Sequence, residues 1–166
     1  EQLLLEISKR SSLEIVIIRP PLVYGPNVKG NFLRLLKLAY NRIPLPILNI
    51  KNSRSLVGLE NLVDFISHCI NHKAAPGKVF LVSDGQDLST PELVNKLGLA
   101  MEKSQILIPI PIFILNIFFN IFGKSEEFDR LVSSLKLDCS HTNNLLNWYP
   151  PKNISENIFN TVKWYL

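Results

Sequence analysis

The chain has only two cysteines and seven glycines among its 166 residues. Cysteine patterns identify many secreted proteins, and glycine patterns identify many nucleotide-binding proteins. Cys69 and Cys139 cannot form a disulfide framework, and so few cysteines fit a reducing compartment, which predicts a cytoplasmic protein. The glycines are scattered, and they form no glycine-rich phosphate loop. The sequence therefore carries no dinucleotide-binding loop of the usual kind.

Charge of either sign is also sparse, because charged residues make up 19% of the chain and the formal net charge is only +4. The basic residues concentrate in the first third, but they form no dense stripe with interleaved aromatic residues of the kind that binds nucleic acid. We therefore expect a small phosphate-bearing ligand and no nucleic-acid partner. His68 and His72 have a metal-like spacing, but this pair alone is not a ligand set, so we predict no metal site.

One stretch lacks charge altogether, the 17 residues from Ile106 to Phe122. Pro109 and Pro111 interrupt its first third, and the remaining helical part is too short to cross a ~30 Å bilayer at ~1.5 Å per residue. The run is therefore expected to be a buried core helix or a contact with a partner. Contact with a membrane surface is the less favoured alternative, because no basic face accompanies the apolar one.

Apolar spacing, caps and prolines predict an alternation of helices and strands. The chain begins inside a helix without a cap, as expected for a piece of a longer protein. Strands are predicted at 13–19, 54–57, 78–83 and near 135–137. Helices are predicted at 31–40 and 60–72, and two more are predicted after the capping residues Ser89 and Asn153. Residues 43–47 are predicted to be an extended segment held by prolines.

Three landmarks follow one another along the chain. They are the strand end Arg19-Pro20-Pro21-Leu22-Val23-Tyr24-Gly25-Pro26, the segment Asn31-Phe32-Leu33 ahead of Arg54-Ser55-Leu56-Val57, and the strand 80–85 followed by Ser89-Thr90-Pro91-Glu92-Leu93. In this order they resemble the C-terminal half of the extended short-chain dehydrogenase/reductases. Within that family they look most like the NAD-dependent UDP-hexose 4-epimerases and 4-keto-sugar reductases of polysaccharide synthesis. The resemblance covers essentially the whole chain.

The resemblance implies an α/β fold that consists of the last two parallel strands of a Rossmann-type sheet and a mostly helical substrate-binding lobe. Residues 1–26 would end the NAD(P)-binding domain, and residues 27–77 would form a substrate-binding segment with short strands and helices. Residues 78–85 would be the last Rossmann strand, and residues 86–166 would form the C-terminal substrate-binding lobe. The intact enzyme would be able to form a homodimer.

The resemblance also implies NAD or NADP as the cofactor of the full-length enzyme and a UDP-sugar as its substrate. The residues that would lie beside the nicotinamide are Pro20, Pro21, Leu22 and Val23. The residues that would contact the substrate are Asn31 and Leu33 near the diphosphate and ribose, Leu45, Pro46 and Ile47 along the uracil, and Arg54 and Arg130 at the diphosphate. The chemistry agrees, since a diphosphate needs the permanently charged, fork-shaped donors of arginine, and a helix start adds positive dipole. A flat base needs an apolar slot with free backbone groups beside it, which a proline-held segment can offer.

One departure from the family pattern concerns catalysis. The family's Tyr-x-x-x-Lys pair is absent, because neither Tyr24 nor Tyr40 is followed by a lysine four residues later. We therefore expect this chain to be inactive alone, with no catalytic residue and no cofactor bound by itself. The alternatives are a non-catalytic protein or remnant that binds sugar nucleotides or a partner, and a membrane-peripheral protein that uses residues 106–122.

Overall fold

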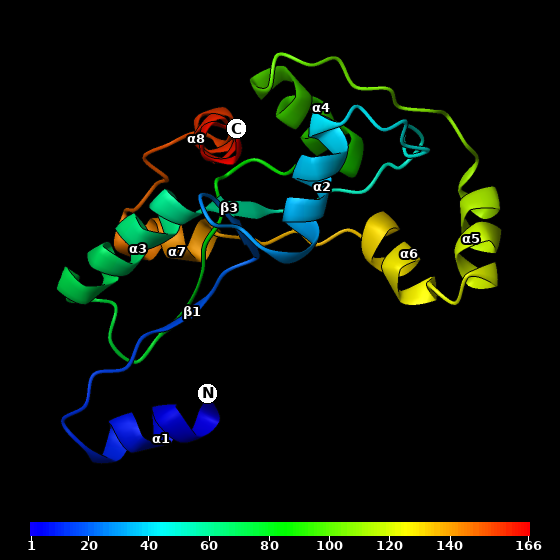
Figure 1. The fold of residues 1–166 in the computed structure, drawn as a ribbon. Coiled ribbons are helices and arrows are strands. Elements are labelled where there is room, and N and C mark those ends of the chain that lie inside the picture. The colour runs from blue at the N-terminus through cyan, green and yellow to red at the C-terminus, as the bar shows by residue number, and fades with distance from the viewer.

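The computed structural model describes all residues, 1–166, as an assembly of helices around two very short sheets (Figure 1). The helices are α1 (Gln2–Arg10), α2 (Gly30–Tyr40), α3 (Leu59–Asn71), α4 (Thr90–Ala100), α5 (Ile112–Ile121), α6 (Ser125–Val132), α7 (Ser140–Leu146) and α8 (Ile154–Tyr165). The strands are β1 (Ile17–Arg19), β2 (Leu22–Tyr24), β3 (Leu56–Gly58) and β4 (Val79–Leu81).

The two strands that sequence predicts for the end of a parallel sheet do pair with each other. β1 runs parallel to β4, with Ile18 opposite Phe80, and the amide of Ile17 extends the ladder by donating to the carbonyl of Lys78 at 3.0 Å. Both strands are shorter than the predicted ranges 13–19 and 78–83, because only residues with a hydrogen-bonded neighbour form a ladder and β1 has one neighbour. The predicted parallel pairing is thus confirmed, in shortened form.

A second sheet was not expected from the sequence. After Pro20 and Pro21 the chain resumes an extended course, and β2 pairs in parallel with β3, with Val23 opposite Val57. The predicted strand at 54–57 is therefore shifted to 56–58, and the strand predicted near 135–137 is only a single bridge between Arg54 and Leu135. Sequence patterns missed β2 because two prolines directly before it are typical of a loop.

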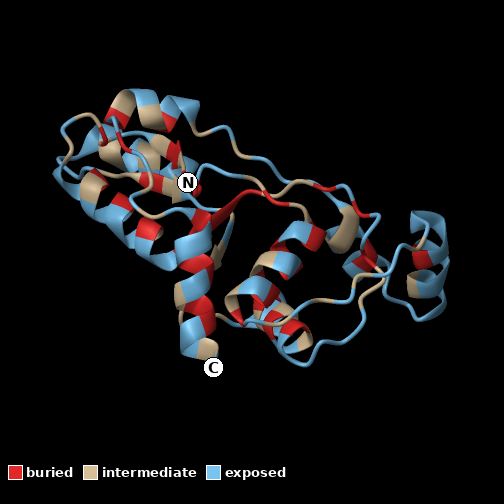
Figure 2. Ribbon diagram, turned by 90° about the horizontal axis from the view of Figure 1, so that it is seen from above, coloured by how far each residue is buried: buried red, intermediate tan, exposed pale blue.

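Two hydrophobic clusters hold the molecule together. The larger one lies between α2, α4 and α8, where Phe32, Leu97 and Ile158 are almost fully buried. The smaller one lies between α3 and β4, where the Phe65 ring packs edge-on against Trp148, with ring centroids 4.8 Å apart. Burial follows the inner faces of the helices, as the red segments in Figure 2 show.

The capping predictions are confirmed at both helix starts. The Ser89 hydroxyl accepts from the amide of Glu92, whose carboxylate accepts in return from the amide of Ser89, and Asn153 and Glu156 repeat this capping box at α8. The reciprocal bonds satisfy amide groups that would otherwise have no partner in the first turn. They fix where α4 and α8 begin, and the start of α4 forms one edge of the cleft described below.

The uncharged run does not form a buried core helix, the first of the two alternatives expected for it, and the second alternative, a contact with a partner, stays a prediction. α5 forms within it, but Leu115 is the helix's only buried residue, and the helix packs mainly on α6 at one end of the molecule (Figure 1). The prolines before α5 carry the chain away from the core, so the helix cannot lie across it. α1, at the opposite end, has no buried residue at all. No helix in the structure has the length and apolar character needed to cross a membrane.

Candidate ligand-binding cleft

A cleft of about 350 Å³ opens where the start of α2, the residues before β3, the start of α4 and the α5–α6 pair meet. Its wall is mixed, with ten apolar and eight polar residues. The apolar ones are Leu22, Phe32, Leu35, Leu38, Leu56, Leu88, Leu93, Phe119, Leu131 and Leu135. The polar ones are Asn31, Arg34, Arg54, Ser55, Ser89, Thr90, Glu127 and Arg130.

The charge in this wall is predominantly positive. Arg34, Arg54 and Arg130 supply three permanent cations, and Glu127 supplies the only carboxylate, so the wall carries a net charge of +2. Arg54 is half-buried in this largely apolar wall, so water screens its attraction for a phosphate or carboxylate less than it screens that of the exposed Arg34 and Arg130. The cleft is therefore suited to an anion with apolar parts.

Arg54 is the most firmly held of these cations. Its backbone exchanges two hydrogen bonds with Leu88, at 2.9 and 3.0 Å, and its Nη1 donates to the carbonyl of Arg130 at 2.8 Å. The other two guanidinium nitrogens, Nε and Nη2, have no acceptor within the chain. A half-buried guanidinium, anchored on one side and free on the other, is oriented in advance for an anionic ligand.

The start of α2 contributes a second anion-binding feature beside the arginines. No side chain caps this helix, since Lys29 occupies the N-cap position in an extended conformation. The first turn therefore keeps its amide groups free and its positive dipole end uncompensated. Asn31 and Arg34 line the cleft from this turn, three residues apart on the same helix face.

The structure brings together four of the residues that the resemblance implies for ligand contact: Leu22, Asn31, Arg54 and Arg130. Arg130 is exposed and already paired with Glu126, with Nη2 and Oε2 3.0 Å apart, so it is less constrained than Arg54. Sequence reasoning missed Arg34, although its spacing of three from Asn31 on a predicted helix was a usable signal.

The other implied residues lie outside the cleft wall. Leu33 packs on the larger core cluster, and Val23 on the smaller one. Ile47 belongs to a third small cluster with Ile50 and Val94, against which Leu45 packs. Pro20 is exposed, whereas Pro21 and Pro46 are half-buried, and none of the three lines the cleft.

The free backbone groups expected in the segment 45–47 are largely occupied. The amide of Leu45 donates to Ile106 at 2.9 Å, and its carbonyl accepts from Ile108 at 2.8 Å and from Ile47 at 2.9 Å. The start of the uncharged run therefore pairs with this segment, as the bridge between Leu45 and Leu107 also shows. These backbone groups are committed within the chain and are not open to a flat base.

A buried polar network behind the cleft was also missed. Asp84 follows β4, is only 6% exposed, and accepts hydrogen bonds from three groups through its side chain. These are the hydroxyl of Tyr24 at 2.6 Å, the amide of Gly58 at 2.9 Å and the side-chain nitrogen of Asn61 at 2.7 Å. Burial first, and the neighbouring Asp84 second, raise the pKa of Tyr24 far above its usual range, so Tyr24 is a structural donor.

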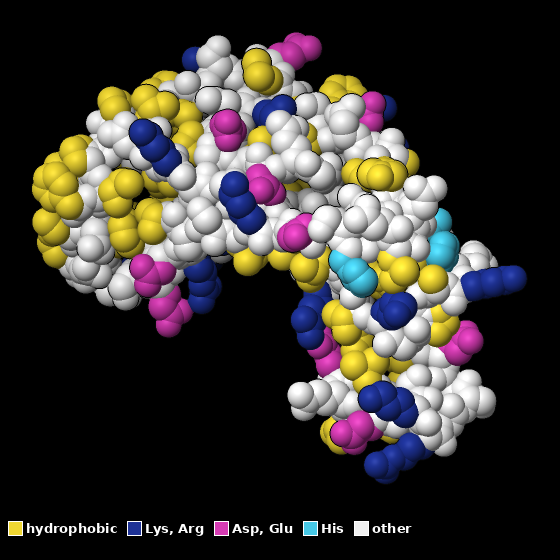
Figure 3. All heavy atoms as spheres, turned by 180° about the vertical axis from the view of Figure 1, so that it is seen from behind, with side chains coloured by type: hydrophobic (Ala, Val, Ile, Leu, Met, Phe, Trp, Pro, Cys, Tyr) yellow, Lys and Arg dark blue, Asp and Glu magenta, His cyan; other side chains and the backbone are white.

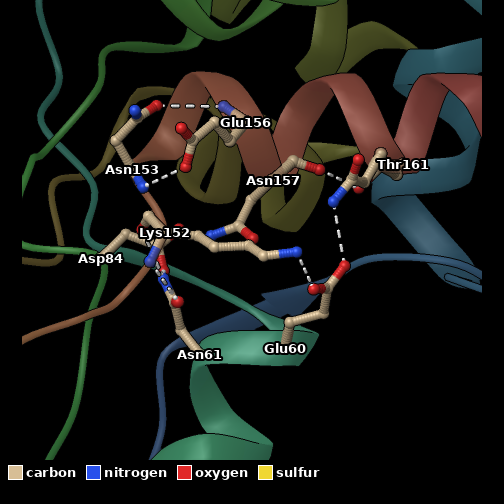
Figure 4. A network of polar contacts seen from close by, with 9 residues as sticks. Glu60, Asn61, Asp84, Lys152, Asn153, Glu156, Asn157 and Thr161 are labelled. Atoms are coloured by element: carbon tan, nitrogen blue, oxygen red, sulfur yellow. Dashed lines mark hydrogen bonds and ion pairs between the residues drawn. The ribbon is translucent and has the colours of Figure 1, made fainter.

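The same network continues from Asp84 and Asn61 to the loop that caps α8 (Figure 4). Asn61 donates to the carbonyl of Lys152 at 2.8 Å and accepts from the amide of Lys152 at 3.0 Å. The Lys152 ammonium pairs with Glu60, which also accepts from Asn160 at 2.9 Å. Asp84 and Asn61 therefore lock β2, β3 and the start of α3 to the loop before α8.

Arg19, Cys69 and His68 make only structural contacts within the chain. Arg19 pairs with a carboxylate, that of Glu1. Cys69 is buried, and burial raises the pKa of its thiol to about 11, which suits a core residue. His68 lies within hydrogen-bonding distance of the carbonyl of Leu146, at 2.9 Å, and the described residues contain no cluster of metal-ligating side chains.

Solved structures define the class of this fold. The chain superposes on RMD from Pseudomonas aeruginosa, solved with NADPH, with a TM-score of 0.72 and 15% identity, covering 99% of this chain and 51% of that one. It superposes on UDP-glucuronic acid 4-epimerase from Bacillus cereus, solved with UDP-glucuronic acid and NAD, with a TM-score of 0.69 and 19% identity, covering 98% and 49%. The architecture is that of the C-terminal part of extended short-chain dehydrogenase/reductases.

The sequence comparison is more specific. The chain is 47% identical over 167 aligned residues to UDP-glucose 4-epimerase from Vibrio cholerae, an alignment that covers 100% of this chain and 51% of that protein. No protein-family model matches the chain. The chain thus spans about half the length of this curated relative. It is a homologue of the nucleotide-sugar epimerases and corresponds to the C-terminal portion of the extended short-chain dehydrogenase/reductase family.

Proposed function

We propose that this chain is the substrate-binding portion of an NAD-dependent nucleotide-sugar 4-epimerase or 4-keto-sugar reductase of polysaccharide synthesis, and that its cleft binds a UDP-sugar. The observation that carries the proposal is the grouping of Arg34, Arg54 and Arg130 beside the uncapped start of α2. A diphosphate carries two charged groups, and this wall offers both fixed cations and free helix amides to receive them.

Within this proposal Arg54 is the principal diphosphate ligand. Its Nη1 bond to the Arg130 carbonyl fixes the plane of the guanidinium, and the two unbonded nitrogens can donate in parallel to phosphate oxygens. Asn31 adds an amide donor from the first turn of α2, and the leucines of the cleft wall exclude water from the pair. The sugar would then extend toward Leu22 and β2.

The cofactor would meet the chain at β2. Leu22 is 42% exposed and lines the cleft, so a flat nicotinamide ring can lie beside it, close to where the sugar would sit. A bound dinucleotide supplies the hydride exchange with the sugar that both reaction types require. The residues at hand form one wall of such a site, with Pro20 and Pro21 next to Leu22.

The proton relay of the reaction is not available from these 166 residues. None of the four tyrosines is followed by a lysine four residues later, and Tyr24, the buried one, donates to Asp84 and keeps its proton. We therefore propose that the chain by itself binds a nucleotide sugar without converting it. A non-catalytic sugar-nucleotide-binding protein is the second candidate, and the same observation favours it.

Calorimetric titration of the chain with UDP-glucose and UDP-N-acetylglucosamine tests the binding proposal. Arg54→Gln removes a charge-assisted contact worth about 1.5–3 kcal/mol, so we expect affinity to fall about tenfold to a hundredfold. Arg10→Gln is the matched control, because Arg10 is exposed on α1 and has no hydrogen bond or ion pair in the structure, and its affinity should stay unchanged. Equal affinities for wild type and Arg54→Gln would overturn the assignment.

Turnover is measured separately, by adding NAD and following the sugar product. We expect no product from the chain alone. Product formation with added NAD would contradict the proposal that the chain only binds.

A further inference from the structure

Apart from the cleft, the main exposed apolar surface lies on the outer side of α5. Six of its apolar residues and its C-cap residue Phe122 are exposed, and Phe113, Phe118, Ile121 and Phe122 are each more than half exposed. Figure 3 shows hydrophobic side chains gathered over this end of the molecule. An uncovered apolar area of this kind on a helix marks a binding surface.

This surface is continuous with the cleft. Phe119 of α5 lines the cleft, and its ring packs against Phe128 of α6, with centroids 5.8 Å apart. Phe118, the next residue and itself exposed, packs against Phe122 with the ring centroids 4.7 Å apart and the rings tilted at 48°. An apolar path therefore leads from the arginines to the exposed side of α5 without crossing a charged side chain of that helix.

The side of the cleft expected to receive a base fits an apolar group better. The backbone of Leu45 is committed to Ile106 and Ile108, and the side chains of Leu35 and Leu131 join the cleft wall to the cluster around Ile47. A base needs polar partners at its edge, whereas a hydrocarbon needs none.

Charge beside α5 distinguishes between occupants of this surface. α5 has no basic residue, and α6 next to it carries Glu126, Glu127 and Asp129 against Arg130 alone. An anionic membrane surface would be repelled by these carboxylates. Arg54, the half-buried cation, lies in the cleft wall, so a ligand that uses both features has its negative charge in the cleft and its apolar part on α5.

Resting on the diphosphate site proposed above, we propose that the cleft also accepts a sugar diphosphate whose second substituent is a long isoprenoid hydrocarbon, and that α5 binds this hydrocarbon. The diphosphate occupies the same arginines in both ligand classes. Uridine is replaced by a chain that leaves the cleft past Phe119 and lies along Phe118 and Phe122.

A series of diphosphates with increasing chain length isolates the role of α5. Inorganic pyrophosphate and dimethylallyl, geranyl and farnesyl diphosphate share one anion and differ in hydrocarbon only. We expect affinity for the chain to rise about fourfold per five-carbon unit, the change that burial of about one methylene group produces. The double variant Phe118→Gln/Phe122→Gln should flatten this series and leave the affinity for UDP unchanged. Ile70→Gln, at an equally exposed position on α3, should alter neither.

The possible results separate this inference from the proposed function. If UDP binds and depends on Arg54, but farnesyl diphosphate binds no better than pyrophosphate, the inference fails and the proposed function stands. A chain-length series that persists in the α5 double variant also overturns the inference. If no diphosphate binds, both fail.

Two further measurements identify a different occupant of α5. If the wild type binds phosphatidylcholine vesicles, the double variant does not, and diphosphate affinity does not depend on hydrocarbon length, the surface is assigned to a membrane. A dimer in sedimentation that the double variant dissociates, again without a chain-length series, would assign it to a second copy. Either result overturns the inference.

Discussion

Replacing Asp84 with alanine removes the acceptor of three donors in one step. The carboxylate accepts from Tyr24, Gly58 and Asn61 at 2.6–2.9 Å, and it is almost fully buried, so water cannot take its place without opening the structure. A hydrogen bond to a charged group contributes about 1.5–3 kcal/mol. The three are coupled and share one residue, so we expect a loss of about 4 kcal/mol in the free energy of unfolding.

Asp84→Asn provides the graded comparison. Its amide keeps one oxygen for Gly58 and Asn61 and turns a donor toward Tyr24, whose own proton can shift to the carbonyl of Ile154, now 3.4 Å away. We expect this variant to lose only about 1 kcal/mol. Glu14→Ala is the surface control, because Glu14 is exposed and makes no hydrogen bond or ion pair, and it should change stability by less than about 0.5 kcal/mol.

Urea unfolding followed by circular dichroism measures all three variants. A loss of about 4 kcal/mol also lowers Tm by about 8–16 °C in a chain of this size. The expected order of stability is wild type, then Asp84→Asn, then Asp84→Ala. If Asp84→Ala loses less than about 1 kcal/mol, the network does not hold β2 and β3 to α3, and the reasoning is refuted.

Two further predictions concern Tyr24 and Gly98. Burial, and to a smaller extent the neighbouring Asp84, raises the pKa of Tyr24 in the folded state. Tyr24 therefore does not affect stability below about pH 10, and above it the free energy of unfolding falls by up to about 1.4 kcal/mol per pH unit, because the unfolded chain loses the proton first. Urea unfolding at pH 8–11 should show a shallower alkaline decline for Tyr24→Phe than for wild type. Gly98→Ala would gain about 1 kcal/mol of helix propensity, but its new Cβ would lie 2.6 Å from the carbonyl oxygen of Lys103, so we expect a net loss of about 1 kcal/mol in urea.

Controls on exposed positions distinguish these effects from general damage. Tyr149→Phe should keep the wild-type alkaline slope, because Tyr149 is 63% exposed, and equal slopes for Tyr24→Phe and wild type would contradict the first prediction. Leu99→Ala, at a 77% exposed position of the same helix, should stay within about 0.5 kcal/mol of wild type. A stabilising Gly98→Ala would contradict the second.

Sequence patterns predicted the structure correctly where it depends on residues that are close together in the chain. The reciprocal caps at Ser89 and Asn153 bind atoms only three residues apart, so sequence spacing predicts both helix starts. Apolar spacing predicts a helix over 60–72, and α3 forms at Leu59–Asn71. The predicted inner face is wrong, however, because Val63, Ile66 and Ile70 are exposed and Phe65 and Cys69 face the core. The pairing of β1 with β4 followed from the family resemblance, and the structure confirms it in shortened form.

The uncharged run shows where local signals fail. Its composition predicts a buried core helix or a contact with a partner, and no local pattern chooses between them, because burial depends on what surrounds a helix and α5 packs mainly on α6. The segment 45–47 shows the same limit, since the sequence pattern leaves its backbone groups free, whereas the amide and carbonyl of Leu45 bond to Ile106 and Ile108 in the structure. Whether this segment lies along a uracil stays a prediction.

The sequence by itself determined the family, the main helices with their caps, and the arginines that make an anion-binding site plausible, because these depend on residue type and short spacing. Only the tertiary structure decided that Arg34, Arg54 and Arg130 share one cleft with Asn31. It also decided that Asp84 joins donors 23 to 60 residues away, and that α5 lies uncovered beside the cleft. The physical reason is that burial, charge clustering and shared hydrogen bonds arise from packing between distant segments, which no local pattern encodes.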